Sequence, residues 1–525
     1  MSPVHQPPTQ IDPETDPNRT LRGARPFLGL IGATAILYGL GLGSLDLWAP
    51  DEPRYAAIAE ELRSFRHGLE GLVLLHLNDT AYTQKPPLYF WLAALFGAPF
   101  GRVTEFAARL PSAIAGVACV ALTAWIGRML LGRGAAALLA AGLLATSFRF
   151  AFTARRAQLD VLLTACELGA IALFLVLETR RGGIEEARRS PLVIAGLHAA
   201  LGAAALVKGP VGWLPLGVFA GYLAWQGRGR AFRAIGPWWS WILSIGPLAV
   251  WAAAAIALAP PGFAETAIAE NLLGRFFAGT SHARPFYYYL YQLPLDFLPW
   301  SLVLPFGLTL VWHAARARMP QPKTSPLARS SARFLLAWAA LPILFFTLSA
   351  GKRGVYLLPI FPALALISAL LVQRTPRKRP RWLCKRRLAA AIATFAVIEM
   401  LLVLVALPRL DELKSPRSIA IAAATHGEAG EPIGVFGLSP IEGALAYYAG
   451  CRVASLGDEQ ALRSFLESGG HIVLLRERDL NALDPRLGLE ELEGFRSGRR
   501  RLVLAIAADP DFPEGQWRPH DREGP

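Results

Sequence analysis

The sequence predicts a mainly α-helical protein that crosses a membrane many times and carries a small α/β domain after its last span. Of the 525 residues, 53% are hydrophobic and 14 are Trp, which is typical of a chain built largely for lipid. The apolar residues gather in runs long enough to cross a bilayer. After about residue 408 this pattern gives way to short segments with the periods of strands and helices.

The first apolar run covers residues 27–47 and follows a polar, Pro-rich segment, residues 1–25. No small-residue cleavage site follows the run, so we expect an uncleaved signal anchor with a disordered N-terminus in the cytoplasm. Further runs of spanning length cover residues 107–131, 135–152, 161–177, 192–207, 211–225, 238–258, 297–312, 334–349, 355–372 and 388–407. The membrane domain, residues 26–408, should therefore contain about eleven spans, within a range of about 11 to 13.

The run at residues 88–100 is too short to cross a bilayer and contains Pro99, so we expect it to be re-entrant or interfacial. Without it, the basic connections 128–133, 180–189, 228–233, 316–333 and 374–387 all lie on the side of the N-terminus. This is the positive-inside pattern. The formal net charge of +14 then faces anionic lipid, and nucleic acid is not needed as a partner to explain it.

The odd number of spans places residues 409–508 outside, which in a bacterium is the periplasm. Residues 433–438, 453–456, 471–476 and 501–507 predict strands, and residues 441–449 and 459–467 predict helices. This pattern indicates a small α/β domain of about a hundred residues. It has no nucleotide-binding glycine motif and no metal-ligand cluster, so we assign it no chemistry. The Pro- and charge-rich tail, residues 509–525, is expected to be disordered.

Several charged or polar residues fall at the outer membrane boundary, where they are costly and therefore suggest function. They are Asp51, Glu52, Arg54 and Lys85 in a long outer loop (residues 48–106), Asp160 and Lys208 at the ends of spans, Arg275 in a second outer loop (residues 259–296), and Lys352 and Tyr356. Lysine and arginine can neutralise a phosphate leaving group, and a carboxylate can deprotonate an acceptor or hold a divalent ion. Because no Walker A motif is present, a lipid-carried sugar donor fits better than a soluble nucleotide sugar.

Five motifs together carry a resemblance to known proteins. They are DEPRYA at residues 51–56, QKPPL at 84–88, ARLPSA at 108–113, RRAQLD at 155–160 and KRGVYLLP at 352–359. In combination they resemble the signatures of bacterial GT-C glycosyltransferases. The chain is most similar to the family that joins the lipid A aminoarabinose transferases and the dolichyl-phosphate-mannose protein mannosyltransferases. The resemblance runs from the first span to about residue 362.

The resemblance implies an inverting glycosyltransferase of the inner membrane, with its active site in the periplasm. It would move a sugar from undecaprenyl phosphate, or another polyprenyl phosphate, to lipid A or another envelope acceptor. Asp51 would be the essential carboxylate, acting as base or metal ligand, and Asp160 the second acid. Lys85, Arg275 and Tyr356 would contact the donor phosphate, and Glu52, Arg54 and Lys352 would support the site.

Alternatives remain open at this point. The acceptor could be Ser or Thr of a protein, as in a protein O-mannosyltransferase. A membrane transporter, or a non-catalytic envelope-assembly protein, could also carry charged residues at this boundary. No cofactor is certain, and a Mg²⁺, Mn²⁺ or Zn²⁺ ion at Asp51 is a hypothesis. Individually, Asp51 could cap a helix, Asp160 could pair with Arg155 or Arg156, and Lys85 or Arg275 could anchor the chain at the interface.

Overall fold

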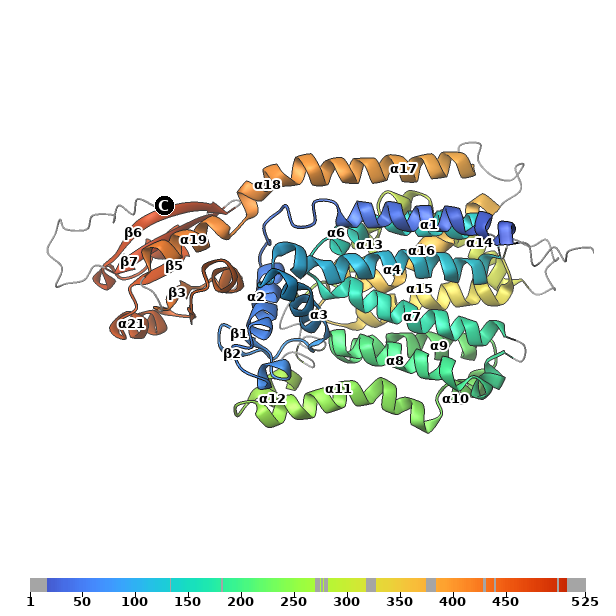
Figure 1. Cartoon of the computed structure of the whole chain (residues 1–525), viewed down its shortest axis with the longest axis horizontal. Coiled ribbons are helices and arrows are strands. Elements are labelled where there is room, and N and C mark those ends of the chain that lie inside the picture. Colours follow the sequence, from blue (N-terminus) through green and yellow to red (C-terminus); the bar gives the residue numbers. More distant parts are fainter. Residues whose placement is uncertain are drawn as a thin grey trace, which may run out of the picture.

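The computed structural model describes residues 17–132, 134–180, 183–269, 274, 277, 282–317, 327–373, 384–427, 431–438, 441–497 and 500–507. It has two parts, an elongated bundle of helices and a smaller α/β part beyond one end of the bundle (Figure 1). The elements that connect the two parts lie at that same end.

The longer helices of the bundle run side by side along its long axis, and shorter helices lie among them or at their ends (Figure 1). They are α1 (Pro17–Gly39), α4 (Glu105–Leu131), α5 (Gly134–Ala145), α6 (Phe148–Ala154), α7 (Leu159–Thr179), α8 (Pro191–Lys208), α9 (Leu214–Trp225), α10 (Phe232–Ile235), α11 (Trp238–Leu258), α13 (Tyr288–Asp296), α14 (Leu304–Arg316), α15 (Arg329–Leu348), α16 (Phe361–Ala369) and α17 (Lys385–Leu401). Shorter elements near the α/β part are α2 (Asp51–Arg63), β1 (His76–Leu77), β2 (Thr80–Ala81), α3 (Leu88–Gly97) and α12 (Phe263–Glu265).

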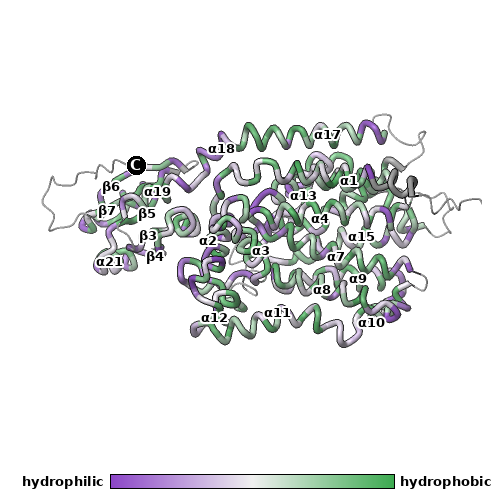
Figure 2. Tube along the Cα trace, in the orientation of Figure 1, coloured by the Kyte–Doolittle hydropathy of each residue, from purple (hydrophilic) through white to green (hydrophobic). Residues whose placement is uncertain are grey.

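By length and composition, six helical segments in the described part of the chain could cross a membrane, or seven if the bent pair α5 and α6 counts as one span. Hydrophobic residues follow the bundle helices, and hydrophilic residues gather towards their ends (Figure 2). Helix α11 and the segment that begins with α17 are each only 11% buried over their apolar windows. Apolar helices left uncovered by protein are typical of helices that face lipid. The prediction of about eleven spans stays a prediction.

Several expected elements have other bounds in the structure, and α1 and the run at residues 135–152 are among them. Helix α1 begins at Pro17, earlier than the expected span at residue 27, because hydropathy marks the apolar part of a helix rather than its end. The run expected at residues 135–152 is broken into α5 and α6, which are bent by 68°. At the break the Thr146 and Ser147 hydroxyls donate to the carbonyls of Gly142 and Leu144, a local bonding that competes with continuous helix.

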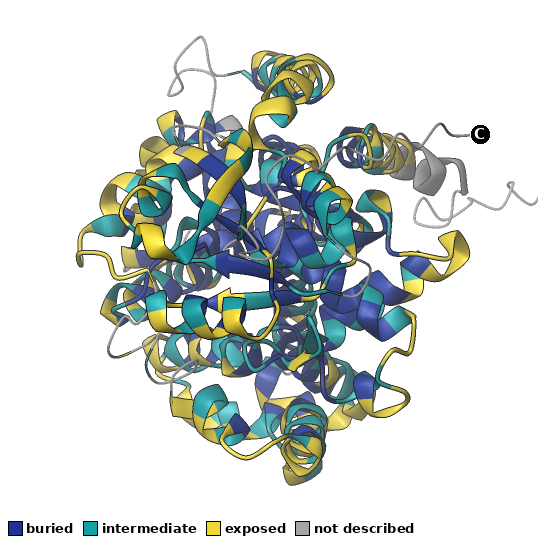
Figure 3. Cartoon of the chain, turned by 90° about the vertical axis from the view of Figure 1, so that its left-hand side faces the viewer, coloured by how far each residue is buried: buried dark blue, intermediate teal, exposed yellow. Residues whose placement is uncertain are grey.

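Several large aromatic side chains pack inside the bundle, and buried residues gather in the middle of the molecule (Figure 3). The rings of Phe174 and Phe219 stack with centroids 4.1 Å apart, and Phe334 stacks on Phe174. Nearby, the indole N–H of Trp338 donates to the carbonyl of Pro359 at 3.0 Å, within the 3₁₀ segment η8 (Gly354–Ile360). This core holds the end of η8 firmly, and η8 begins at the charged site described below.

The α/β part follows α18 (Leu407–Lys414) and α19 (Arg417–His426). Its five-stranded sheet has the order β4-β3-β5-β7-β6, with β3 parallel to β4 and β5, and with β7 antiparallel to β5 and β6. The elements are β3 (Ile433–Phe436), α20 (Glu442–Ala444), β4 (Val453–Leu456), α21 (Glu459–Glu467), β5 (Ile472–Arg476), α22 (Glu477–Leu480), β6 (Leu489–Ser497) and β7 (Arg500–Ala507). Edge strand β6 was not expected from the sequence. The predicted tail, residues 509–525, lies outside the described residues.

The α/β part rests directly on α2. A Cβ atom added to Gly443 of α20 would lie 2.5 Å from the Cα atom of Arg54, so only glycine allows the two helices this approach. The hydroxyl of Tyr448 accepts a hydrogen bond from the backbone N–H of Leu47 at 2.6 Å, just before α2. Helix α2 is therefore held between the bundle and the α/β part.

Candidate active site at one end of the bundle

Helix α2 starts at Asp51, directly after Pro50. Two acidic residues in its first turn favour the helix because they lie at the positive end of the helix dipole. The Asp51 carboxylate does not cap the helix; it is turned instead to two arginines. One oxygen pairs with Arg54, and the other accepts a hydrogen bond from Arg353 of the η8 loop at 3.0 Å.

Asp51 is only 6% exposed, yet its surroundings keep it charged. Burial raises the pKa of the carboxyl, but the positive charges of Arg353, Arg54 and Lys85 outweigh burial and leave the pKa below its ordinary value. The carboxylate is thus ionised at neutral pH. The half-buried Lys85 is one of the charges that lower the pKa of Asp51, so its ammonium group lies close to that carboxylate. The sequence placed both residues in the same outer loop.

Glu52 is engaged in a different way from its neighbour. It is 1% exposed and accepts hydrogen bonds from the backbone N–H groups of Trp48 at 3.0 Å and Ala157 at 2.8 Å. It also pairs with Arg109 at 3.0 Å and with Arg156 at 2.9 Å. Because both oxygens bind groups from three segments, Glu52 ties these segments together and has no open side towards a substrate.

Asp160 lies at the start of α7 and pairs with Lys208, the last residue of α8. It does not pair with Arg155 or Arg156, the partners that the sequence suggested. The ammonium group of Lys208 also lies 4.5 Å from the ring centroid of Tyr356, a cation–π contact. Asp160 and Tyr356, far apart in the sequence, are thus joined through Lys208.

Arg353 links Asp51 to Asp160, since it interacts with both carboxylates. Burial lowers the pKa of its guanidinium, but the carboxylates of Asp51 and Asp160 outweigh this and raise the pKa above its ordinary value. The structure therefore brings together Asp51, Lys85, Asp160 and Tyr356, all named from the sequence. Lys208, which the sequence also placed at this boundary, and Arg353 of the motif at residues 352–359 complete the group. Arg275 lies outside the described residues.

Lys352, the neighbour of Arg353, supports the loop rather than opening towards solvent. It is 4% exposed, and its ammonium group donates to the carbonyl oxygens of Arg284, at 3.2 Å, and of Ser349. Burial lowers the pKa of Lys352. Its backbone N–H donates to the carbonyl of His282 at 3.0 Å, so this loop and the segment around His282 form one wall.

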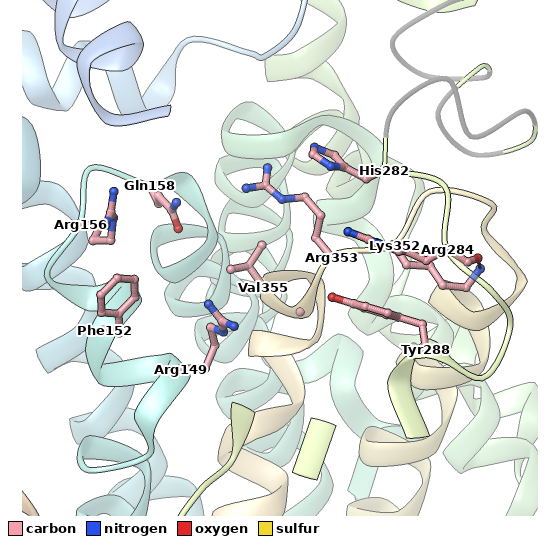
Figure 4. Close-up of a pocket in the computed structure, with 11 residues that line it drawn as sticks. Arg149, Phe152, Arg156, Gln158, His282, Arg284, Tyr288, Lys352, Arg353 and Val355 are labelled. Carbon is pink, nitrogen blue, oxygen red and sulfur yellow. Dashed lines mark hydrogen bonds between the residues drawn. The ribbon is translucent and has the colours of Figure 1, made fainter. Parts of the chain in front are cut away.

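Next to these residues is a cavity of about 260 Å³ with a strongly cationic lining. The described residues that line the cavity include no Asp or Glu. Among them are Arg149, Phe152, Arg156, Gln158, His282, Arg284, Tyr288, Lys352 and Arg353. Figure 4 shows Arg149 and Arg156 on one side of the cavity and Arg284, Lys352 and Tyr288 on the other, with Arg353 between. A cavity lined by so many cations fits a phosphate group.

Carboxylates outside the cavity hold its arginines in place. Asp296, at the end of α13, pairs with Arg149 at 2.8 Å and also accepts from the Gln292 amide at 2.7 Å. A Cβ atom on Gly354 would overlap the Asp296 carboxylate, so the close packing here requires glycine. The α6 side and the η8 side of the cavity are therefore fixed to each other through Asp296.

Sequence reasoning missed the arginines of this cavity at positions 149, 156 and 284 as site residues. One signal was present: Arg149 interrupts the apolar run at residues 135–152, where a charged residue is costly in lipid. The bend between α5 and α6 places the Arg149 side chain at the cavity, so the charge is not exposed to lipid.

Asp51 was also named as a metal ligand. In the described part of the chain, the group of His and carboxylate side chains close enough to hold an ion is Glu61, His67 and Asp79, and Asp51 is not in it. Both Asp51 oxygens are engaged by arginines. A metal at Asp51 stays a prediction.

The sequence of the chain is similar to those of known proteins. Residues 84–253 match the family described as dolichyl-phosphate-mannose-protein mannosyltransferase. The undecaprenyl phosphate-alpha-4-amino-4-deoxy-L-arabinose arabinosyl transferase of Pseudomonas aeruginosa UCBPP-PA14 is 33% identical over 361 residues, which are 66% of this chain and 59% of that protein. A relative of the same name from Pseudomonas fluorescens Pf-5 is 32% identical over 69% of this chain and 62% of the relative. This chain thus spans about three fifths of the length of these relatives.

Solved structures show the same fold. ArnT from Cupriavidus metallidurans bound to undecaprenyl phosphate superimposes with a TM-score of 0.71 at 20% identity, covering 93% of this chain and 99% of that one. The oligosaccharyltransferase of Archaeoglobus fulgidus matches with a TM-score of 0.55 at 14% identity, over 87% of this chain and 69% of that one. The chain is thus similar in sequence to bacterial aminoarabinose transferases over about two thirds of its length, and similar in fold to ArnT over most of it.

Proposed function

We propose that this protein is a glycosyltransferase that moves a sugar from undecaprenyl phosphate, or a related polyprenyl phosphate, to lipid A or another acceptor of the bacterial envelope. The single observation that carries the proposal is the juxtaposition of the ionised Asp51 with the arginine-lined cavity, joined by Arg353. The names of the relatives and the undecaprenyl phosphate bound to the similar ArnT structure support the same donor.

In the proposed reaction the donor phosphate occupies the cationic cavity, near Arg149, Arg284 and Lys352. An acceptor oxygen forms a bond to the anomeric carbon from the face opposite the phosphate, and the bond from that carbon to the phosphate oxygen breaks. The electron pair of the broken bond stays on the polyprenyl phosphate. The surrounding cations stabilise the charge that develops on the leaving phosphate. We also assign contacts with this phosphate to Lys85, Tyr356 and Arg275.

Asp51 is placed to act on the acceptor, with Asp160 as the second acid. Two states of the acceptor are compatible with its geometry. If the acceptor is a hydroxyl, its proton passes to Asp51; if it is an ionised phosphate, such as lipid A carries, no proton has to be removed. A carboxylate with a lowered pKa is a weak general base at neutral pH. This favours an acceptor that is already ionised, and Asp51 would then orient it through Arg54 and Arg353.

A protein O-mannosyltransferase is the second candidate, because the mannosyltransferase family matches residues 84–253. It would need Asp51 to take a proton from Ser or Thr, which the lowered pKa of Asp51 disfavours. A transporter is less well supported, since its site should lie near the middle of the membrane. Here the charged group lies where α2, the start of α7 and the end of α8 meet.

The proposed topology places the site and the α/β part, residues 409–508, in the periplasm, and the N-terminus in the cytoplasm. The membrane domain would use about 11 to 13 spans of the inner membrane, including apolar segments shorter than the longest helices. The positive-inside distribution of the basic connections supports this orientation.

Mass spectrometry of envelope lipids and of glycoproteins, from cells with and without the protein, tests the proposal. We expect one lipid class to lose a pentose- or hexose-sized mass when the gene is deleted and to regain it with the wild-type protein. Asp51→Asn should not restore the mass, whereas Glu105→Gln, which removes a charge from the start of α4, should. A mass lost from glycoproteins instead would select the mannosyltransferase, and no change in either class would refute sugar transfer.

A further inference from the structure

A second group of ionisable side chains lies at the far end of α2 from Asp51. Glu61 is on the last turn of α2, His67 follows the helix, and Asp79 lies in the turn between β1 and β2. At about 1.5 Å per residue, Glu61 lies about 15 Å along the helix from Asp51. The group is thus separate from the proposed catalytic site but is carried by the same helix.

Each carboxylate in this group has one oxygen committed elsewhere. The Oε1 atom of Glu61 accepts a hydrogen bond from the backbone N–H of Asn78 at 2.6 Å. The Oδ2 atom of Asp79 pairs with Arg66 at 2.8 Å and with Arg452 at 3.2 Å. These contacts fix both side chains and turn their second oxygens towards the ring of His67.

The three remaining ligand atoms converge. The Nε2 atom of His67 lies 3.1 Å from Oε2 of Glu61 and 3.6 Å from Oδ1 of Asp79, and all three atoms lie within 4.8 Å of one another. Ligand atoms bound about 2.1 Å from a tetrahedral zinc ion lie about 3.4 Å apart. The observed separations are therefore close to those of three zinc ligands, with a fourth position open to water.

His76 adds a further observation. Its ring stacks on that of His67 with centroids 3.8 Å apart, and its Nδ1 atom is buried with no hydrogen-bond partner among the described residues. A second imidazole therefore lies against the ring of His67, and imidazole nitrogen is the commonest metal ligand in proteins.

The group also lies where the α/β part meets the bundle. The side-chain amide of Asn78 donates to the carbonyl of Val453 at 2.6 Å and its oxygen accepts from the Val453 N–H at 2.8 Å, which joins the hairpin to β4. Arg452, which precedes β4, contacts Asp79 directly. Any ion held at Asp79 would therefore stabilise the contact between α2 and the α/β part.

We propose that Glu61, His67 and Asp79 bind one Zn²⁺ ion, which fastens the end of α2 and the β1–β2 hairpin to the α/β part. Imidazole nitrogen with carboxylate oxygen suits zinc better than calcium or magnesium, which prefer all-oxygen sites. The role is structural, so it does not depend on the reaction proposed for Asp51.

The test uses the full-length purified protein in detergent, stripped with a chelator and titrated calorimetrically with ZnCl₂. We expect one ion per chain, and a thermal midpoint that rises with zinc concentration because the ion binds only the folded state. His67→Ala and the near-isosteric Glu61→Gln should each weaken zinc binding by at least about 100-fold, since losing even an outer-shell partner costs about 10- to 100-fold.

His471→Ala removes an exposed histidine elsewhere and is the matched control, and it should bind zinc like the wild type. Protection of the Asn78–Val453 contact from hydrogen exchange should increase with zinc in the wild type and not in Glu61→Gln. A wild-type protein that binds no zinc, or unchanged binding in both ligand variants, would overturn the proposal. Loss of binding in Asp51→Asn with retention in His67→Ala would place the ion at Asp51 and would also overturn it.

Discussion

Replacement of Glu52 by Gln should destabilise the protein more than any other loss of one carboxylate charge near the site. Glu52 is 1% exposed and neutralises Arg109 and Arg156, whose side chains are only 5% and 14% exposed. The introduced side-chain amide would turn an N–H₂ group towards guanidinium donors and leave buried positive charge without compensation. Removing one partner of a buried ion pair costs about 3 to 5 kcal/mol.

The matched control is Glu105→Gln, because Glu105 pairs with Arg102 at 3.8 Å and the Arg102 side chain is 64% exposed. A pair this loose, with one partner largely exposed, is worth less than about 1 kcal/mol. Thermal unfolding of both variants in detergent, followed by Trp fluorescence at one scan rate, measures the difference. We expect a clearly lower midpoint for Glu52→Gln than for Glu105→Gln. Equal midpoints would refute the argument that Glu52 ties three segments together.

Three further predictions concern the site. Gly443→Ala should push α20 away from Arg54 at a cost of about 1 to 3 kcal/mol and lower the transfer rate, whereas Gly457→Ala, where no atom lies within 4 Å, should do neither. Arg353→Gln should move the acid limb of the pH–rate profile to higher pH. The lowered pKa of Asp51 keeps the carboxylate ionised until the pH falls through that pKa, and loss of Arg353 raises the pKa of Asp51. An acid limb at the wild-type pH would contradict this. Lys208→Gln should lower kcat by at least about tenfold (~1.4 kcal/mol) with a smaller change in the KM for the donor, because Asp160 loses its partner. Initial rates measured against donor concentration give both constants. A change in KM alone would contradict the prediction.

Much of the fold could be predicted because hydropathy and charge report directly on the membrane. The expected run at residues 238–258 coincides with α11, and the expected helix at residues 459–467 coincides with α21. Strand β6 escaped prediction because its glutamates face solvent at the edge of the sheet, and a bulge between Glu491 and Glu493 interrupts its alternation. Period-two patterns identify strands only where one face is buried throughout.

The sequence could place residues of different motifs on one side of the membrane, but it could not predict which of them pair across the bundle; their roles stay predictions. The sequence indicated that Asp51, Lys85, Asp160 and Tyr356 lie on one face, because topology alternates the ends of the spans. It could not show that Asp160 pairs with Lys208, since nearer arginines were available in its own motif. Such choices depend on the angles at which helices pack, which apolar periodicity does not encode.

The central claim is that Asp51 acts in sugar transfer and that the neighbouring cavity holds the donor phosphate. Purified wild-type, Asp51→Asn and Glu105→Gln proteins can be compared in a transfer assay with a polyprenyl-phosphate sugar donor and an envelope lipid extract, alongside undecaprenyl phosphate binding. The account predicts that Asp51→Asn transfers at least about 100-fold more slowly than the wild type while still binding undecaprenyl phosphate, and that Glu105→Gln matches the wild type. A folded Asp51→Asn protein that transfers sugar at the wild-type rate would contradict it.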